Sequence, residues 1–178
     1  PGCGKTHEAG RWAARAAARY GHDKVLVCSL TRAGAKQAAR DIDLPFSQLG
    51  TMHSFAYRAL GSPVLAESKT AEFNEAYPHL ALSAYTSTTD DSYGRGEGKT
   101  DGDQAKLDAS WYRTMHIPVE HWTKSHAVDF YTAWNDWKKQ CGYVDFTDLI
   151  ETATTDCDKA PGDPAVLLCD EAQDTGKL

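Results

Sequence analysis

Two short apolar runs constrain the fold of this chain more than any other feature. Residues 24–30 (KVLVCSL) and residues 165–169 (AVLLC) are brief and rich in aliphatic side chains. Such runs are typical of strands that are buried on both faces of a sheet. Residues 47–51 (SQLGT) predict a third, shorter strand. Because helix-like segments alternate with the early strands, the pattern predicts an α/β fold with parallel strands and crossover helices.

Helical segments surround these strands. Residues 6–20 are rich in alanine and arginine, which are good helix formers, and Gly21 follows as a stop. Pro45 ends a second helix, and Asp145 is a suitable cap for the last one. Positions 128, 131 and 134 would share one face of a long amphipathic helix. The expected helices span residues 6–20, 31–42, 52–60, 70–77, 103–115, 119–142 and a stretch that begins near Phe146.

The chain changes character in its middle section. Residues 84–104 are polar, contain four glycines and lack apolar periodicity, which predicts a loop. Amphipathic segments on either side of this loop favour a helical insert. The predicted organisation is a sheet-forming part at residues 1–61, a helical accessory insert at residues 62–142, and a return to the first part at residues 143–178.

The overall composition is that of a globular protein. Hydrophobic residues make up 41% of the chain and charged residues 25%, and the formal net charge is −6. This charge argues against a surface built for indiscriminate nucleic-acid binding, although it leaves room for a local basic groove. No apolar run is long enough to span a membrane. Five cysteines without a C-x-x-C pair favour reduced thiols inside a cell, and the histidine spacing indicates no metal site.

The segment PGCGKT at residues 1–6 matches the second half of a phosphate-binding loop. The full pattern is G-x-x-x-x-G-K-[ST], between a buried strand and a helix. Gly4, Lys5 and Thr6 supply its last three fixed positions, so its first glycine and its strand are expected before Pro1. In such a loop Lys5 reaches the β- and γ-phosphates, and the Thr6 hydroxyl binds Mg²⁺. A helix that begins near Lys5 would direct its positive end at the phosphates.

The last predicted strand ends in two acids, Asp170 and Glu171. Ligands bind at the carboxyl edge of open α/β sheets, and this strand would bring both acids to that edge. Asp170 would hold Mg²⁺, mostly through water, and Glu171 would orient or deprotonate the attacking water. Separately, a GKT tripeptide is a frequent coincidence, and an apolar run before DE is often a strand with a solvated turn. Together they favour a nucleotide hydrolase. The predicted nucleotide-binding residues are Gly2, Cys3, Gly4, Lys5, Thr6 and Asp170.

Four blocks resemble UvrD/Rep-type superfamily 1 DNA helicases, in the order in which that family carries them. The specific blocks are DEAQDT at residues 170–175 and LGTMHSF at residues 49–55; the moderate ones are VLVCSLTRAGAKQAARDI at 25–42 and YVDFTDLIE at 143–151. The insert stands where the family has an accessory helical subdomain. The resemblance implies a RecA-like P-loop lobe with helices on both faces of its sheet. It further implies a motor that uses ATP and Mg²⁺ to move 3′ to 5′ on single-stranded DNA and to unwind duplexes, as in DNA repair or replication.

The resemblance also assigns roles to single residues. Lys5 and Thr6 match the nucleotide loop, and Asp170 and Glu171 match the metal and hydrolysis acids. Gln173 matches the glutamine that senses the γ-phosphate and links it to DNA binding. An amide suits that role because it donates and accepts hydrogen bonds without a change of charge. The alternative for Gln173 is a solvated position at the start of a helix.

The family's DNA track corresponds to five polar residues that follow the first two strands. Hydroxyl, imidazole and guanidinium groups bind phosphates without reading base sequence. Each has an alternative role: the two threonines could cap helices, the arginine could be a solvated surface residue, and the histidine could be structural. Leu30 stands where the family often has a stacking aromatic, and Arg32 replaces its asparagine. The track residues are Thr31, Arg32, Thr51, His53 and Ser54, and the D-F-x-D-L acids Asp145 and Asp148 are expected to cap and pack.

The expected protein is therefore an internal fragment of such a helicase, inactive by itself. Its expected partners are the first strand and second motor lobe of the same protein, single-stranded DNA, and the junction between single-stranded and duplex DNA that the helicase unwinds. The expected location is the cytoplasm of a bacterial or phage-infected cell. Another P-loop hydrolase or kinase, and a non-catalytic nucleic-acid-binding domain with a relict loop, are the two alternatives. The chain has no N-K-x-D segment to support a GTPase. The intact Lys5, Thr6, Asp170 and Glu171 argue against a relict.

Overall fold

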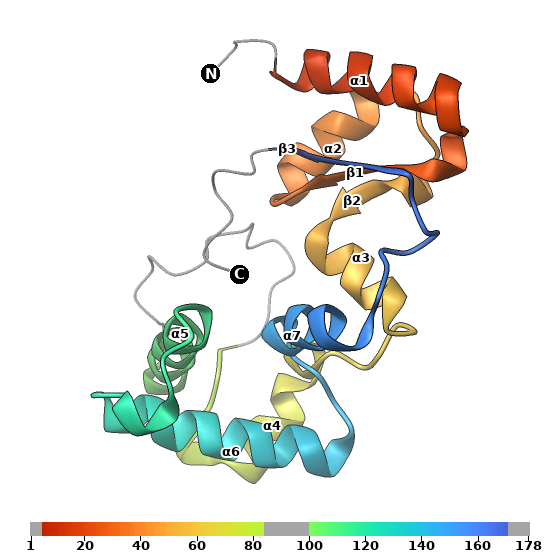
Figure 1. Cartoon of the computed structure of the whole chain (residues 1–178). Coiled ribbons are helices and arrows are strands. Elements are labelled where there is room, and N and C mark those ends of the chain that lie inside the picture. The colour runs from red at the N-terminus through yellow and green to blue at the C-terminus, as the bar shows by residue number, and fades with distance from the viewer. Residues whose placement is uncertain (1–4, 84–99, 171–178) are drawn as a thin grey trace. The chain divides into compact units, whose positions relative to one another are not determined.

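The computed structural model describes residues 5–83 and 100–170 (Figure 1). Contacts divide these residues into two compact units. The first contains residues 5–62 and 150–170 and is called the sheet unit. The second contains residues 63–83 and 100–149 and is called the helical unit. Within the described residues, no helix is both long and apolar enough to cross a membrane.

The sheet unit contains three described strands, β1 (Val25–Ser29), β2 (Leu49–Thr51) and β3 (Val166–Asp170). All pairings are parallel and the strand order is β2-β1-β3, so β1 is the central strand of the three. All five residues of β1 are buried, as its uninterrupted run of aliphatic and small side chains predicts. The predicted α/β fold with a parallel sheet is confirmed.

Helices cover both faces of this sheet. α1 and α2 share one face, where their alanines pack against Val25 and Val27 of β1. α3 covers the other face through Phe55, which contacts Leu26 and Cys28. Alternate residues of β1 therefore meet opposite helix layers, as the two-residue period of a strand requires. The helices are α1 (Lys5–Tyr20), α2 (Arg32–Asp41) and α3 (Met52–Ala59).

β3 differs from the strand that the sequence predicts. Leu168 packs in the same cluster as α1 and α2, but the side chain of Leu167 is 57% exposed and Cys169 is also exposed. These two residues alternate with Leu168 and so face the α3 side, where the described part of the chain leaves β3 uncovered. The expectation of a strand buried on both faces, with Cys169 inside, is therefore wrong.

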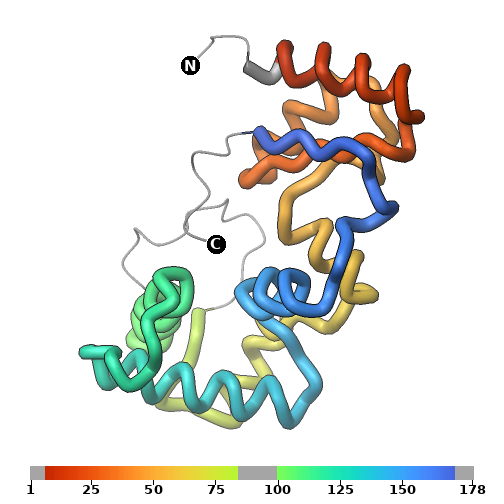
Figure 2. The backbone as a smooth tube through the Cα atoms, in the orientation of Figure 1, coloured from red at the N-terminus to blue at the C-terminus, as the bar shows by residue number. Residues whose placement is uncertain are grey.

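The helical unit is built around an aromatic core. The ring of Phe73 is fully buried, and its centroid lies 4.8 Å from that of Trp134 and 5.3 Å from that of Trp137, both edge-to-face. The ring centroid of Phe130 lies 5.7 Å from that of Phe73, also edge-to-face. Edge-to-face pairs of this kind add to the stability that burial supplies. Phe73 lies on α4 (Thr70–Ala76), and the other three rings lie on α6 (Ser125–Cys141). Figure 2 follows the backbone of the unit, which also contains α5 (Asp101–Thr114) and the first residues of α7 (Phe146–Asp156).

α6 begins later than the sequence predicts. The predicted helix at residues 119–142 starts only at Ser125, after a 3-10 turn at Val119–His121. The Trp122 indole N–H donates to the carbonyl of Ile117 at 2.7 Å, and its ring stacks on Tyr112 with centroids 4.7 Å apart. Because this ring is seated in the core, the chain turns there before the helix can begin.

α5 begins earlier than predicted, inside the polar stretch 84–104. The Asp103 N–H donates to Thr100 Oγ1 at 3.0 Å, and the Thr100 N–H donates to Asp103 Oδ2 at 3.1 Å, which is a capping box. Gly102 is required because a Cβ there would lie 2.3 Å from the carbonyl oxygen of Leu80. The loop prediction is therefore wrong for residues 101 and 102, residues 103 and 104 are helical as the predicted helix 103–115 has them, and residues 84–99 lie outside the described residues.

The predicted end of the insert at residue 142 also differs from the contacts. Residues 143–149 belong to the helical unit. Val144 forms an isolated parallel bridge with Leu65, and the carboxylate of Asp145 binds Arg113 of α5 and Lys138 of α6. These contacts attach the segment that precedes α7, and the first turn of α7, to the helical unit.

Candidate functional site

Three polar residues end the three strands side by side. Ser29 of β1 is in register with both Thr51 of β2 and Asp170 of β3. Neighbouring strands lie about 4.8 Å apart, so the three residues form a continuous row at the carboxyl edge of the sheet. Each lies two positions after a strand residue (Val27, Leu49 or Leu168) that packs in the hydrophobic cluster with α1 and α2. The row therefore lies on the face that these two helices cover.

α1 begins at the same edge of the sheet. It packs against β1 and β3, and a short segment with a turn at Gly21 (φ 96°) joins its end to the start of β1. The helix therefore runs against the strands, and Lys5 begins it at their carboxyl ends (Figure 1). The first turn of a helix carries unpaired N–H groups and partial positive charge. The prediction of a helix that starts near Lys5 is confirmed.

Several predicted site residues cannot be placed in this geometry. For Lys5 and Thr6 the structure describes the backbone alone. The others lie outside the described residues: Gly2, Cys3, Gly4, Glu171 and Gln173.

Sequence reasoning missed Ser29, the central residue of the row. Its side chain is 1% exposed, and its Oγ atom has no hydrogen-bond partner. The hydroxyl lies against the first turn of α2: a Cβ on Gly34 would stand 2.3 Å from Ser29 Oγ and 3.1 Å from Thr31 Oγ1. Position 34 of α2 therefore needs a glycine, because the Ser29 hydroxyl occupies the space where a Cβ atom would lie. The sequence signal, a serine that ends an aliphatic strand, is too common to be diagnostic.

Thr31 and Arg32 begin α2 next to this hydroxyl. Thr31 is the N-cap, and its Oγ1 accepts the N–H of Gly34 at 2.9 Å. The capping role given above as the alternative for Thr31 is thus confirmed. The accepted bond leaves the hydroxyl hydrogen of Thr31 available to a phosphate oxygen. Arg32 is the first helical residue and is exposed.

Thr51 and Ser54 form a capping box at the start of α3. Thr51 Oγ1 accepts the Ser54 N–H at 3.2 Å, and Ser54 Oγ accepts the Thr51 N–H at 3.0 Å. Ser54 Oγ also donates to the Thr51 carbonyl at 2.7 Å. Ser54 therefore uses its only hydroxyl hydrogen inside the box and keeps none for a phosphate. Capping is confirmed for Thr51, whose own hydroxyl hydrogen stays available, and His53 is half-buried beside it.

The donor set of the row suits Mg²⁺. Asp170 supplies a carboxylate, and this hard cation prefers oxygen ligands; the hydroxyls of Ser29 and Thr51 occupy the neighbouring positions of the row. In the part of the chain that the structure describes, no three His, Cys, Asp or Glu side chains gather as a metal site. A magnesium ion in a nucleotide site commonly takes one or two carboxylates and completes its shell with water and phosphates. A single carboxylate at this edge is therefore sufficient.

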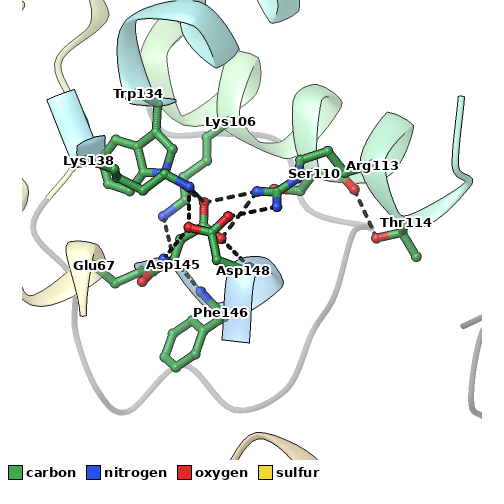
Figure 3. A network of polar contacts seen from close by, with 10 residues as sticks. All are labelled: Glu67, Lys106, Ser110, Arg113, Thr114, Trp134, Lys138, Asp145, Phe146 and Asp148. Atoms are coloured by element: carbon green, nitrogen blue, oxygen red, sulfur yellow. Dashed lines mark hydrogen bonds and ion pairs between the residues drawn. The ribbon is translucent and has the colours of Figure 1, made fainter. Parts of the chain in front are cut away.

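The D-F-x-D-L acids belong to a different cluster, inside the helical unit (Figure 3). The Asp148 N–H donates to Asp145 Oδ1 at 2.8 Å, and the Asp145 N–H donates to Asp148 Oδ2 at 2.9 Å, so the two acids cap α7 reciprocally. Asp145 also accepts the Trp134 indole N–H at 2.9 Å and two bonds from Arg113 at 3.0 and 3.2 Å. The predicted capping role is confirmed.

The charges around Asp145 are balanced within this cluster. Burial alone would raise the pKa of Asp145, but Lys138, Arg113 and the hydrogen bonds outweigh burial and hold the pKa well below its usual range. Sequence reasoning missed this cluster because Arg113 lies 32 residues before Asp145 and no local pattern connects them. Because its acids are bound on several sides by side chains of the same unit, we interpret the cluster as structural.

No family model matches this chain, and comparisons with curated proteins and with solved structures also gave no match. The function is therefore argued from the residues and geometry of the row and from the motifs that surround it.

Proposed function

We propose that this chain forms part of the first motor lobe of an ATP-dependent DNA translocase of the UvrD/Rep superfamily 1 type. One observation supports the proposal most: Asp170, Ser29 and Thr51 form an in-register row at the edge where α1 begins. P-loop phosphoryl-transfer sites need a lysine-bearing loop at a helix start and a magnesium-holding acid at this same edge. The sequence carries GKT at the first of these points and DE at the second.

Each residue would supply one part of the chemistry. Lys5 would neutralise charge on the β- and γ-phosphates, while Thr6 and Asp170 would hold Mg²⁺. Glu171 would orient the attacking water and accept its proton. The bound ion would stabilise negative charge on the phosphates. Gln173 would respond to the presence of the γ-phosphate through its amide.

Single-stranded DNA would lie over the starts of α2 and α3 at the same edge. Arg32, the Thr31 hydroxyl hydrogen and the half-buried His53 offer donors to phosphate oxygens. These groups contact a backbone and do not distinguish one base from another, so binding would be independent of sequence. Arg32 is the one permanent positive charge among the track residues, which predicts a modest salt dependence from this lobe.

The proposal has one structural implication. In the family that the chain resembles, ATP lies between two motor lobes, so we expect turnover and duplex unwinding only in a protein that carries both.

Substitutions in the two-lobe protein test this function. Lys5→Ala should abolish ATP turnover, because the charge on the phosphates is lost. Glu171→Gln should keep Mg·ATP binding and block hydrolysis, because the metal ligands survive while the water-orienting carboxylate does not. Lys159→Ala is the control, since Lys159 is exposed and pairs only with Asp163, four residues on, in the contacts described.

Two outcomes would contradict the proposal. Hydrolysis by the Glu171→Gln variant at the rate of the parent would remove Glu171 from the chemistry. A parent protein that binds single-stranded DNA without binding Mg·ATP would instead support the alternative of a nucleic-acid-binding domain with a relict loop.

A further inference from the structure

Two buried side-chain oxygens of the described residues have no hydrogen-bond partner, Ser29 Oγ and Glu67 Oε2. Buried hydroxyls in native proteins are nearly always hydrogen-bonded, and an unpaired one lowers stability. Ser29 is fully enclosed by the sheet and by α2, where an alanine methyl group would fit without this penalty. The hydroxyl therefore needs an explanation other than packing.

The surroundings of Ser29 are fitted to its hydroxyl. Gly34 lies in the first turn of α2 and leaves the space that the oxygen fills, since a Cβ there would be 2.3 Å away. A glycine inside a helix costs stability relative to alanine. Ser29 and Gly34 are thus matched to each other: the glycine leaves the space, and the buried hydroxyl lies in it without a hydrogen-bond partner.

The register gives Ser29 one charged neighbour in the row. Asp170 stands directly opposite on β3, on the same face of the sheet, about 4.8 Å away along the strand-to-strand direction. A serine hydroxyl can rotate among three staggered positions about its Cα–Cβ bond. Rotation from the α2 side toward β3 would bring the hydroxyl hydrogen within reach of a carboxylate oxygen of Asp170.

We propose that Ser29 is a positioning residue for Asp170: its hydroxyl donates a hydrogen bond to the Asp170 carboxylate when that carboxylate binds nucleotide-associated Mg²⁺. This inference rests on the proposed function. The bond fixes one carboxylate oxygen and leaves the other toward the ion. Groups that orient metal ligands in this way commonly change metal affinity by 10–100-fold when they are removed.

The test compares Ser29→Ala and Ser29→Cys in the two-lobe protein. Alanine removes the donor, and cysteine keeps the shape with a weak donor. Titration calorimetry with Mg²⁺ and a non-hydrolysable ATP analogue should show about tenfold weaker binding for Ser29→Ala and an intermediate loss for Ser29→Cys. Ser47→Ala, at an exposed serine before β2, should bind like the parent.

A second measurement separates positioning from packing. In urea without Mg²⁺ or nucleotide, Ser29→Ala should unfold at the same concentration as the parent or at a higher one, because no hydrogen bond is lost. Lower stability with unchanged Mg²⁺ binding would make Ser29 a packing residue and overturn the inference, as would no change in either measurement. If the parent itself does not bind the Mg·nucleotide, the proposed function fails and this inference fails with it. If the parent binds and Ser29→Ala binds equally, only the inference fails.

Discussion

Asp145 and Lys138 form an ion pair that is almost entirely removed from solvent, with side-chain exposures of 7% and 4%. Lys138 also pairs with Asp148, and Arg113 pairs with both acids. The pairs join α6 and α5 to the first turn of α7. Removing one member of a buried pair leaves its counterpart charged and unpaired, which is far more costly than the loss of a surface pair.

The first prediction is that Lys138→Met destabilises the helical unit by about 3–5 kcal/mol. Buried Asp145 and half-buried Asp148 would then remain with one cation fewer. Chemical unfolding followed by tryptophan fluorescence measures this, because four of the five tryptophans lie in residues 111–137.

The control for this prediction is Lys124→Met. Lys124 pairs with Asp108 at 2.7 Å, but its side chain is 49% exposed. A surface pair of this kind contributes about 0–1 kcal/mol. Similar losses for Lys124→Met and Lys138→Met would show that burial does not govern the strength of these pairs.

The second prediction concerns acid. The folded-state pKa of Asp145 lies below the value of about 3.9 in an unfolded chain, so the unfolded state binds more protons as the pH falls. The contribution of Asp145 is therefore present at neutral pH and is lost as the pH falls from about 4 toward the folded-state pKa. We expect Asp145→Asn to be much less stable than the parent at neutral pH and to approach it at about pH 2.5.

Urea unfolding of both proteins at the two pH values gives the comparison. Asp129→Asn, at an exposed acid of α6, is the control. A difference between the parent and Asp145→Asn that does not shrink in acid would mean that the charge of Asp145 is not what stabilises the fold.

The third prediction concerns Glu67, whose pKa shift is opposite in direction to that of Asp145. Burial raises the pKa of Glu67 against the opposing charge of Lys106, and Asp145 raises it further. Glu67 Oε1 accepts the Phe146 N–H at 3.3 Å and lies 3.5 Å from Lys106 Nζ, while Oε2 has no partner. The folded state thus binds the proton more tightly than the unfolded chain. Stability falls as the pH rises from about 4.3 through the folded-state pKa.

Glu67→Gln should therefore be at least as stable as the parent at pH 7.5, and its stability should change less than that of the parent between about pH 4.5 and about pH 7.5. Its amide oxygen can keep the bond from Phe146, and a cavity of about 20 Å³ beside Glu67 and Lys106 has room for about one water molecule. Thermal unfolding at both pH values checks this. A large loss of stability at pH 7.5 would show that the ionised carboxylate is needed. Glu75→Gln, at an exposed acid of α4, is the control.

The fold was more accessible to sequence reasoning than the clusters within it. The aliphatic run of β1 and the alternation of strands and helices predict the parallel sheet, because both depend on neighbours along the chain. The contacts of Trp122 and the exposure of Leu167 depend on which distant segments cover them. Local patterns contain no information on either point.

The candidate site divides in the same way. The motifs indicated Asp170, Thr31 and Thr51, since each ends a strand or begins a helix. Ser29 was missed because its importance comes from register with Asp170, 141 residues further on, and from the missing Cβ of Gly34. Ser54 matched a motif, yet its hydroxyl hydrogen is used inside a capping box.

The fourth prediction concerns two neighbouring thiols. Burial, together with the adjacent thiol of Cys169, raises the pKa of Cys28 to about 12. Thiolates rather than thiols react with alkylating reagents, so Cys28 should be protected in the folded protein. Exposed Cys169 should react readily at pH 8, as should exposed Cys141. Peptide mass spectrometry after brief iodoacetamide treatment measures both. Equal labelling of Cys28 and Cys169 would contradict the exposure of one face of β3.

The last prediction concerns DNA and compares two arginines of one helix. Arg32 begins α2 at the carboxyl edge of the sheet, whereas Arg40 lies in the last turn of the same helix, and both are exposed. In the two-lobe protein, Arg32→Ala should weaken single-stranded DNA binding about equally for unrelated sequences and flatten its salt dependence by roughly one phosphate contact. ATP hydrolysis without DNA should change little, because Arg32 is not part of the set of residues that bind the phosphates and the metal.

Arg40→Ala is the control and should leave the DNA affinity and its salt dependence unchanged, since that end of α2 points away from the carboxyl edge of the sheet. Filter binding of two oligonucleotides across a salt series separates a track residue from a solvated one: equal behaviour of the two variants would remove Arg32 from the DNA track.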